Sequence, residues 1–463
     1  MIHNGKTRNC LKRKKGVLEM NIILLSGGSG KRLWPLSNDV RSKQFIRIFR
    51  DAQGQYESMV QRVYRQITAV DPEAKVTVAT SKTQVSAIRN QLGDAVSICV
   101  EPARRDTFPA IALAAAYLQD AQGLDPEEPV VVCPVDPYVD NSYFEAIAQL
   151  EKLARAGAAN LTLMGIEPTV PSKKYGYIIP ESAEHVSPVK EFKEKPDKET
   201  AKLYIAQGAL WNAGIFAFRL KYLIDKAHSM IDFTDYKDLF GKYETLTKIS
   251  FDYAVVEKEP SIQVMRYAGE WKDVGSWNMM AEVMADPAMG NVIVDETCEN
   301  VNVVNELEIP ILVMGCKDMV VAASGDGILV SDKERSGAMK PYVEKIDMEA
   351  RFAEKSWGTY TVIDAQPRSM TIKVDLKAGK RMTYHAHEMR QEVFTVISGE
   401  GRIILGGVEQ KLSAGNTITI PAGSKHIIIA DTDMHAIEVQ VGQEISAKDK
   451  TVYPLPEAFM KAL

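Results

Sequence analysis

The sequence predicts an α/β fold with a mostly parallel sheet covered by helices, followed by two β-rich parts. From Met20 to about Ala288, short aliphatic runs alternate with stretches of helical periodicity, which is the pattern of βαβ units. Beyond about Gly290, short β-runs follow one another without helical periods. The chain has 463 residues, of which 45% are hydrophobic. This length agrees with about two to four domains that bury cores of their own.

The first region contains six runs that we expect to form strands. They span residues 22–25, 75–79, 130–133, 161–165, 215–218 and 262–265, and helical patterns at 110–119 and 143–154 fall between them. Helices that alternate with strands in this way cover a sheet on both faces. We set this domain at residues 20–288.

Two further parts complete the predicted organisation. Residues 289–343 hold four short β-runs at 301–304, 311–313, 319–322 and 327–330, which predict a small β domain or a β-helix-like region. Residues 344–463 hold evenly spaced β-runs punctuated by glycines, which predict a sandwich or a barrel.

Composition excludes several classes of partner. The 56 lysines and arginines are outnumbered by 61 aspartates and glutamates, giving a formal net charge of -5. We therefore expect no nucleic-acid partner, because proteins that read phosphates by bulk charge are usually basic. No apolar run reaches the roughly 18 residues that cross a bilayer, and the first twenty residues lack the apolar middle of a secretory signal. We expect a cytoplasmic protein without a membrane partner.

The cysteines and the basic first residues of the chain lead to two further predictions. The five cysteines show no CxxC spacing, which favours buried thiols in a reducing compartment over a disulfide framework. Residues 1–19 are rich in lysine and arginine, and Met20 opens an apolar run. We expect a disordered extension, or a start of translation at Met20, rather than a basic arm that binds a partner.

A glycine-rich turn follows the first predicted strand. Gly27, Gly28 and Gly30 allow the backbone to approach a ligand closely and to turn its N–H groups toward a phosphate. The spacing matches neither the Walker pattern nor the dinucleotide pattern, so an ordinary tight turn stays an alternative. Arg32 and Lys43 favour the phosphate site, because they could neutralise a triphosphate that glycine N–H groups alone cannot. Two solvated surface cations would be the other explanation.

Several stretches resemble, in the same order, the sugar-1-phosphate nucleotidyltransferases, and in particular the mannose-1-phosphate guanylyltransferases. GGSGKRLWPLSN at 27–38 and SKQF at 42–45 are similar to the usual GGxGxRLWPLSR and PKQF, with Ser42 in place of proline. The other stretches are EPARRDTFPA at 101–110, PVD at 134–136, YGY at 175–177, VKEFKEKP at 189–196, WNAG at 211–214, FDYA at 251–254 and WKDVGSW at 271–277. Pro137 stands where that family has histidine. The resemblance covers about residues 20–340.

The resemblance implies a doubly wound mixed sheet and Mg2+-dependent synthesis of GDP-mannose and pyrophosphate from GTP and mannose 1-phosphate. It implies nucleotide contacts by Ser26, Gly27, Gly28, Ser29, Gly30, Lys31, Glu101, Arg105 and Thr107, and sugar-phosphate contacts by Gly176, Glu194, Lys195 and Asn212. It implies Mg2+ ligands at Asp136 and Asp273, with Arg32, Lys43 and Lys195 completing the catalytic set. Another sugar 1-phosphate, another base, or a sugar-nucleotide sensor without catalysis are the alternatives.

The chemistry of these residues agrees with that reaction. Asp136 follows an apolar run, so we expect it near the carboxyl end of a strand, where open α/β sheets bind ligands. Two aspartates with phosphate oxygens are a usual magnesium site. The attacking sugar phosphate is already an anion, so positioning and charge neutralisation suffice without a general base. A turn role for Asp136 and a solvated charge run at 191–199 are the structural alternatives.

A second site is predicted in the last region. Its sequence matches GxxxxxHxHxxxxExxxxxxG from Gly379 to Gly399 and GxxxxxPxGxxH from Gly415 to His426, the two-part cupin pattern. Residues two apart on a strand face the same side, so His385 and His387 would point together into a barrel. Glu392 and His426 would complete a ligand set for a transition metal such as Zn2+, Fe, Mn, Co or Ni.

Chains that join a guanylyltransferase to a cupin resemble enzymes that also act as phosphomannose isomerase. Those read QxHxHRxEHW, whereas this chain has two extra residues before Glu392 and no HisTrp after it. Isomerase activity therefore stays open. Glu388 and Arg390 could act as base and phosphate contact, or belong to a solvated loop. The apolar run 427–429 predicts a face that a homodimer would bury.

Overall fold

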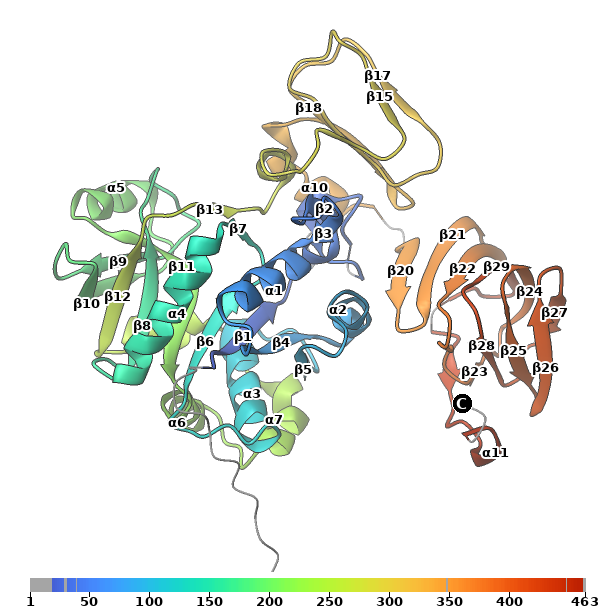
Figure 1. The fold of residues 1–463 in the computed structure, drawn as a ribbon, viewed down its shortest axis with the longest axis horizontal. Coiled ribbons are helices and arrows are strands. Elements are labelled where there is room, and N and C mark those ends of the chain that lie inside the picture. The colour runs from blue at the N-terminus through green and yellow to red at the C-terminus, as the bar shows by residue number, and fades with distance from the viewer. Residues whose placement is uncertain (1–18, 29–30, 39, 347–348, 447, 461–463) are drawn as a thin grey trace, which may run out of the picture.

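The computed structural model describes residues 19–28, 31–38, 40–346, 349–446 and 448–460. The predicted basic extension lies outside these residues except for Glu19. Figure 1 shows an α/β part in blue to green, a small β part in yellow, and a β-sandwich in orange to red. Among the described helices, none is both long enough and apolar enough to cross a membrane.

A nine-stranded sheet forms the centre of the α/β part. Its order is β5 (Ser97–Glu101), β4 (Lys75–Ser81), β1 (Asn21–Ser26), β6 (Pro129–Pro134), β11 (Leu210–Arg219), β8 (Leu161–Ile166), β12 (Ile262–Tyr267), β10 (Val186–Lys193) and β9 (Tyr177–Pro180). The strands β5, β4, β1 and β6 are parallel, whereas β11 runs antiparallel to both neighbours and β10 to β12. The sheet is therefore mixed. This agrees with the mixed sheet that the resemblance implied, although the pattern of apolar runs alone could not show which strand is reversed.

Helices cover both faces of the sheet. They are α1 (Met59–Val70), α2 (Val85–Leu92), α3 (Thr107–Asp120), α4 (Asn141–Ala156), α5 (Lys198–Ala206), α6 (Leu220–Met230), α7 (Tyr236–Lys242), α8 (Phe251–Ala254) and α9 (Trp277–Ala281). One apolar core contains residues of α1 and α4, and the other contains residues of α3 and α6. A short hairpin, β2 (Arg47–Arg50) with β3 (Tyr56–Ser58), precedes α1. This arrangement brings the carboxyl ends of β1 and β6 to one edge.

The small β part has the stacked parallel pairing of a short β-helix. Strands β14 (Ala288–Met289), β16 (Asn302–Asn305) and β18 (Met319–Ser324) pair in parallel, as do β15 (Val292–Val294) and β17 (Ile311–Val313). Strand β19 (Gly327–Asp332) then returns antiparallel to β18, and α10 (Lys340–Val343) follows. The turn between β18 and β19 lies against the α/β part, since a Cβ on Gly327 would come 2.5 Å from the Trp34 ring.

The last part is a sandwich of two antiparallel sheets. One sheet has the order β20 (Phe352–Lys355), β21 (Gly358–Gln366), β22 (Ser369–Leu376), β29 (Met434–Gly442), β24 (Arg390–Ser398) and β27 (Thr417–Ile420). The other has β26 (Val408–Ser413), β25 (Glu400–Leu405), β28 (His426–Ala430), β23 (His385–Ala386) and β30 (Thr451–Val452), and α11 (Glu457–Met460) follows. Apolar side chains of both sheets form one core between them.

Two smaller expectations need correction. Ile427 and Ile429 do not form an open face, because both are buried in a cluster that includes Tyr453 and Leu455 of the chain's own C-terminal segment. The homodimer stays a prediction without this support. Cys99 and Cys133 are buried thiols as expected, but Cys298 and Cys316 are only partly buried, and Cys10 lies outside the described residues.

Candidate functional site

The glycine-rich turn begins where β1 ends. Ser26 is fully buried, and its hydroxyl accepts a hydrogen bond from Gln44 Nε2 at 3.0 Å. Gly28 has a φ of 95°, a conformation that L side chains rarely adopt. A Cβ built on Gly27 would meet no described protein atom within 4 Å. Internal packing therefore does not explain the glycine at 27, whereas a ligand against the backbone would. Ser29 and Gly30 lie outside the described residues.

Ser42, the departure from the usual proline, ties this turn to the next loop. Its hydroxyl donates to the carbonyl oxygen of Gly28 at 2.8 Å and accepts from Gln84 Nε2 at 2.6 Å. Gln84 Oε1 in turn accepts from Thr80 Oγ1 at 2.8 Å. Proline could offer neither of the two bonds of the Ser42 hydroxyl. The substitution thus exchanges a rigid ring for a buried hydrogen-bond network beneath the turn.

The predicted cations gather beside two carboxylates. Lys31 and Arg32 belong to a short 3-10 helix at 31–33, and Lys43 begins another at 43–45. Lys43 Nζ lies 3.0 Å from Asp136 Oδ2 and donates to the carbonyl oxygen of Val274 at 3.0 Å. A Cβ built on Gly275 would lie 3.3 Å from Asp273 Oδ1 and 3.8 Å from Arg32 Nη1. Arg32 and Lys43 therefore border the place where the two aspartates meet.

Asp136 and Asp273 are brought together by a two-stranded ribbon. Asp136 precedes β7 (Pro137–Val139), and Asp273 ends β13 (Trp271–Asp273). These strands pair antiparallel with Asp273 opposite Pro137. The pKa of Tyr175 is raised to about 12 by burial and by the charges of Asp273 and Asp136. Both carboxylates thus act on one aromatic side chain and line one pocket.

Three of the predicted sugar-binding residues also line that pocket, namely Gly176, Glu194 and Asn212, whereas Lys195 is not among its described lining residues. Gly176 accepts a hydrogen bond from the backbone N–H of Asn212 at 2.9 Å. A Cβ on Gly176 would lie 2.5 Å from Glu194 Oε2, so glycine is required for this contact. Lys195 Nζ lies 2.6 Å from Glu194 Oε1. The φ of Lys195 is 45°, a left-handed conformation that costs about 1–3 kcal/mol and is found mainly at functional sites.

Asp252 is a pocket residue to which sequence reasoning gave no role. Its Oδ1 accepts a hydrogen bond from Asn212 Nδ2 at 2.7 Å. Burial, together with the charge of Glu194, raises its pKa to about 6. The stretch FDYA was noticed only as part of the resemblance. Only the folded arrangement shows that this carboxylate orients the amide of Asn212.

The predicted nucleotide contacts at 101–107 fall in two environments. Thr107 lines the pocket, and its hydroxyl accepts from the backbone N–H of Phe251 at 2.8 Å. Glu101 instead accepts from the Tyr243 hydroxyl at 2.9 Å, and Arg105 donates to the carbonyl oxygen of Glu244. Neither of these two is among the described residues that line the pocket. Their role in nucleotide binding stays a prediction.

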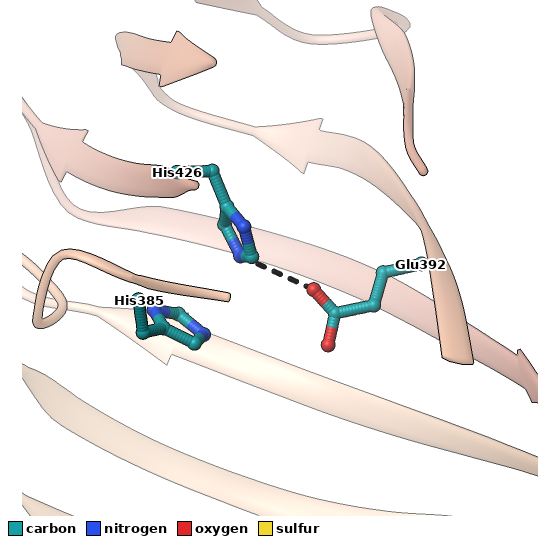
Figure 2. Close-up of side chains that lie close together, drawn as sticks. All are labelled: His385, Glu392 and His426. Atoms are coloured by element: carbon teal, nitrogen blue, oxygen red, sulfur yellow. Dashed lines mark ion pairs between the residues drawn. The ribbon is translucent and has the colours of Figure 1, made fainter. Parts of the chain in front are cut away.

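The second site lies inside the sandwich (Figure 2). His385 on β23 pairs in register with His426 on β28, and Glu392 comes from β24 of the facing sheet. The ligand atoms of these three residues all lie within 4.8 Å of one another, and all three side chains are buried. His426 Nε2 lies 3.2 Å from Glu392 Oε2. The structure therefore brings three of the four predicted metal ligands to one point.

One ring nitrogen of His385 and one of His426 can donate a lone pair to a metal. His385 Nδ1 donates to the carbonyl oxygen of Thr383 at 2.7 Å, and His426 Nδ1 donates to that of Ser424 at 3.0 Å. In the neutral imidazole this leaves Nε2 unprotonated and free to bind a metal. Burial and the nearby charge of Lys450 lower the pKa of His385 to about 3. A neutral, buried two-histidine and one-carboxylate set fits a transition metal.

His387, the fourth predicted ligand, has other contacts. Its Nδ1 bonds the carbonyl oxygen of Asp449. Its Nε2 lies 3.2 Å from Glu392 Oε1 and 3.2 Å from Arg390 Nη2. The described arrangement thus places His387 beside the three converging residues, in contact with one of them and with the guanidinium of Arg390. Its role as a ligand stays a prediction.

Comparisons with known proteins agree with both sites. A family model described as "Nucleotidyl transferase" matches residues 21–289, and one described as "Cupin domain" matches residues 372–440. The mannose-1-phosphate guanylyltransferase of Escherichia coli is 30% identical, over 92% of this chain and 97% of its own. The chain belongs to the mannose-1-phosphate guanylyltransferase family. Xanthan biosynthesis protein XanB of Xanthomonas campestris pv. campestris (strain B100) is also 30% identical, over 92% of this chain and 96% of its own.

A solved structure resembles this member of the guanylyltransferase family. It is a protein of Thermus thermophilus described as a mannose-1-phosphate geranyltransferase, with 28% sequence identity and a TM-score of 0.58. The match covers 71% of this chain but 99% of the other.

Proposed function

We propose that the α/β part transfers a guanylyl group from GTP to mannose 1-phosphate, giving GDP-mannose and pyrophosphate. One observation carries the proposal: a single pocket is lined both by Asp136 and Asp273 and by Gly176, Glu194 and Asn212. The two aspartates are suited to hold Mg2+ and, through it, a triphosphate, whereas the other three residues offer polar groups suited to a sugar. Membership in the guanylyltransferase family supports this choice of substrates.

The reaction needs positioning more than acid–base chemistry. A phosphate oxygen of mannose 1-phosphate attacks the α-phosphorus of GTP, and the bond from that phosphorus to the oxygen bridging to the β-phosphate breaks. Lys43 and Arg32 neutralise charge on the leaving pyrophosphate. Lys195 holds the attacking phosphate, and Glu194 and Asn212 bind sugar hydroxyls. No proton has to be removed from the nucleophile, since it is already an anion.

Asp136 and Asp273 would hold Mg2+. Their oxygen donors are the kind that Mg2+ prefers, and the side chain of Asp136 is 43% exposed, so water could complete the coordination shell. When bound, the ion would neutralise charge that develops on the phosphates. Lys43 Nζ lies 3.0 Å from Asp136 Oδ2, so a cationic side chain would stand beside the ion and the phosphates that it binds.

A substrate grid tests the proposal. The full-length protein is incubated with each of the four NTPs and with mannose, glucose or fucose 1-phosphate, in the presence and absence of Mg2+, and pyrophosphate release is measured. We expect release to be greatest with GTP and mannose 1-phosphate and to require Mg2+. A clear preference for another pair would reassign the substrates, and GTP binding without pyrophosphate formation would favour a sensor. The cysteine pattern predicts that this reaction takes place in the reducing cytoplasm.

For the sandwich we propose a second, metal-dependent function, the interconversion of fructose 6-phosphate and mannose 6-phosphate. The observation that favours it is the convergence of His385, Glu392 and His426. These residues would hold a transition metal such as Zn2+, which when bound would polarise the sugar carbonyl. Interconversion is measured after loading with Zn2+, Co2+ or Mn2+. Metal binding without any interconversion would instead assign the sandwich a structural or sensing role.

A further inference from the structure

One buried carboxylate joins all three parts of the chain. Asp326 lies between β18 and β19 and is 5% exposed. Its Oδ2 accepts a hydrogen bond from Asn38 Nδ2 of the α/β part at 2.5 Å. Its Oδ1 accepts from the backbone N–H of Arg351, just before β20 of the sandwich, at 2.6 Å. Both oxygens of a single side chain are thus used, each by a different part of the chain.

The orientation of Asn38 is determined by its own loop. Its Oδ1 accepts from the backbone N–H groups of Val40 at 2.8 Å and Arg41 at 2.7 Å. The amide nitrogen must therefore point away from this turn and toward Asp326. This turn sets the path of the chain into Ser42 and Lys43. Lys43 is the cation that contacts Asp136, so the turn lies directly before a group of the proposed active site.

The same loop has further attachments to distant residues. Arg41 forms two hydrogen bonds with Glu306, at 2.7 and 2.9 Å, and its guanidinium lies over the ring of Phe352 at 5.3 Å. The Ser324 hydroxyl donates to the carbonyl oxygen of Pro35 at 2.8 Å. The loop between the two short 3-10 helices is thus held by side chains from the small β part and the sandwich, far away in sequence.

We propose that Asp326 is a positioning residue for nucleotide binding, acting by fixing the loop that delivers Lys43. The proposal rests on the proposed guanylyl transfer. Ordering a loop without regular secondary structure costs conformational entropy, and bonds that order it before substrate arrives remove that cost from binding. Sugar binding should not depend on this residue, because the bonds of Asp326 hold the loop before Lys43 and involve none of Gly176, Glu194 and Asn212.

Substitutions at Asn38 and Asp326, made singly and together, distinguish a positioning role of Asp326 from a role in folding. In Asp326→Asn, the new Oδ1 can still accept from the N–H of Arg351, but its amide nitrogen opposes the amide nitrogen of Asn38, so the loop bond is lost. In Asn38→Asp, two carboxylates face each other, while the turn to Val40 and Arg41 is kept. The double variant Asn38→Asp/Asp326→Asn restores a donor opposite an acceptor and retains the bond to Arg351.

We expect each single variant to raise KM for GTP about tenfold, and the double variant to return it to within about threefold of the starting protein. KM for mannose 1-phosphate should stay within about twofold in all three. Glu308→Gln is the matched control. Glu308 forms an exposed ion pair with Lys373 of the sandwich at 3.3 Å; it lies two residues after Glu306 but is not one of the residues named above that hold the loop. It should leave both KM values unchanged.

The affinity of each variant for GTP in the presence of Mg2+ is also measured by calorimetric titration. This measurement does not depend on turnover. If the starting protein transfers no guanylyl group, the proposed function fails, yet the order of GTP affinities still tests the positioning role. Equal GTP affinity and equal KM in both single variants would overturn the proposal. A double variant as impaired as the single variants, with an unchanged melting temperature, would also overturn it.

Discussion

The two sites differ in how they are built. The first is assembled from loops at the edge of a sheet and is open to solvent: the Asp136 side chain is 43% exposed. The second is assembled from strands inside a sandwich, where Glu392 is 4% exposed and the histidines have backbone partners. The open site is suited to two large, charged substrates that must enter and leave. The closed site is suited to an ion that stays.

This difference shows which contacts local spacing can encode. His385, Glu392 and His426 fall in one sequence pattern that runs from Gly379 to His426, and the strands that carry them place all three in one interior. Asp136 and Asp273 lie on distant segments that meet only through the pairing of β7 with β13. A strand-built site can therefore be derived from spacing, whereas a loop-built site depends on topology.

The largest expected effect tests the open site. In Asp273→Asn, loss of a Mg2+ ligand should lower kcat/KM for guanylyl transfer by about 100- to 1000-fold, because metal-borne stabilisation of the phosphate charge is lost. The fold should stay intact by circular dichroism. Asp225→Asn, on the exposed side of α6, is the control and should keep full activity. Near-normal pyrophosphate release from Asp273→Asn would remove this carboxylate from the mechanism.

The next effect tests the closed site. Replacing His385 with alanine should lower Co2+ or Zn2+ affinity about 10- to 100-fold or more, since one of three converging ligands is lost. Affinity is measured by titration and by the visible spectrum of bound Co2+. His435→Ala is the control: His435 is exposed and pairs with Asp375 outside the cluster. Guanylyl transfer should be unchanged in His385→Ala and in His435→Ala. Loss of guanylyl transfer together with metal binding in His385→Ala would contradict the separation of the two sites.

Much of the fold, and part of each site, could be predicted from sequence. The alternation of strands and helices, a small β or β-helix-like region and a final sandwich or barrel were expected, and the resemblance implied a mixed sheet, but which strand reverses was not predicted. The cupin pattern predicted His385, His387, Glu392 and His426 as metal ligands, and the structure brings three of them together, whereas His387 has other contacts. Asp252 lies in a recognised pattern that gave it no role, and Asp326 lies in no recognised pattern. Each acts through a partner far away in sequence, Asn212 in one case and Asn38 in the other.

A smaller effect concerns the pH dependence of the open site. Burial raises the pKa of Asp252 from 3.8 to about 6. The folded protein therefore binds this proton more tightly than the unfolded chain, and stability falls as pH rises from about 4 to about 6. Asp252→Asn removes the charged form, so it should gain roughly 1–3 kcal/mol relative to the starting protein at pH 8 and almost nothing at pH 4.

Urea unfolding at both pH values, followed by tryptophan fluorescence, measures this difference. The fluorescence reports mainly on the α/β part, because Trp34, Trp211, Trp271 and Trp277 lie there and only Trp357 lies beyond it. Asp225→Asn serves again as the control with no expected shift. A stability gain that is equal at pH 4 and pH 8 would show that the effect does not come from ionisation of Asp252.

The smallest expected effect comes from removing the sandwich, and with it the second site. A fragment that ends at Lys345 keeps every residue of the proposed guanylyl transfer. The fragment loses the Arg351 bond to Asp326 and the Phe352 ring beneath Arg41, but the Asn38 bond to Asp326 remains. One hydrogen bond is worth about 1 kcal/mol, or about fivefold in affinity. We therefore expect transfer to persist, with KM for GTP raised about two- to fivefold and less than in Asp326→Asn. Abolished transfer in a folded fragment would mean that the sandwich is part of the first site, and the two sites could no longer be treated as independent.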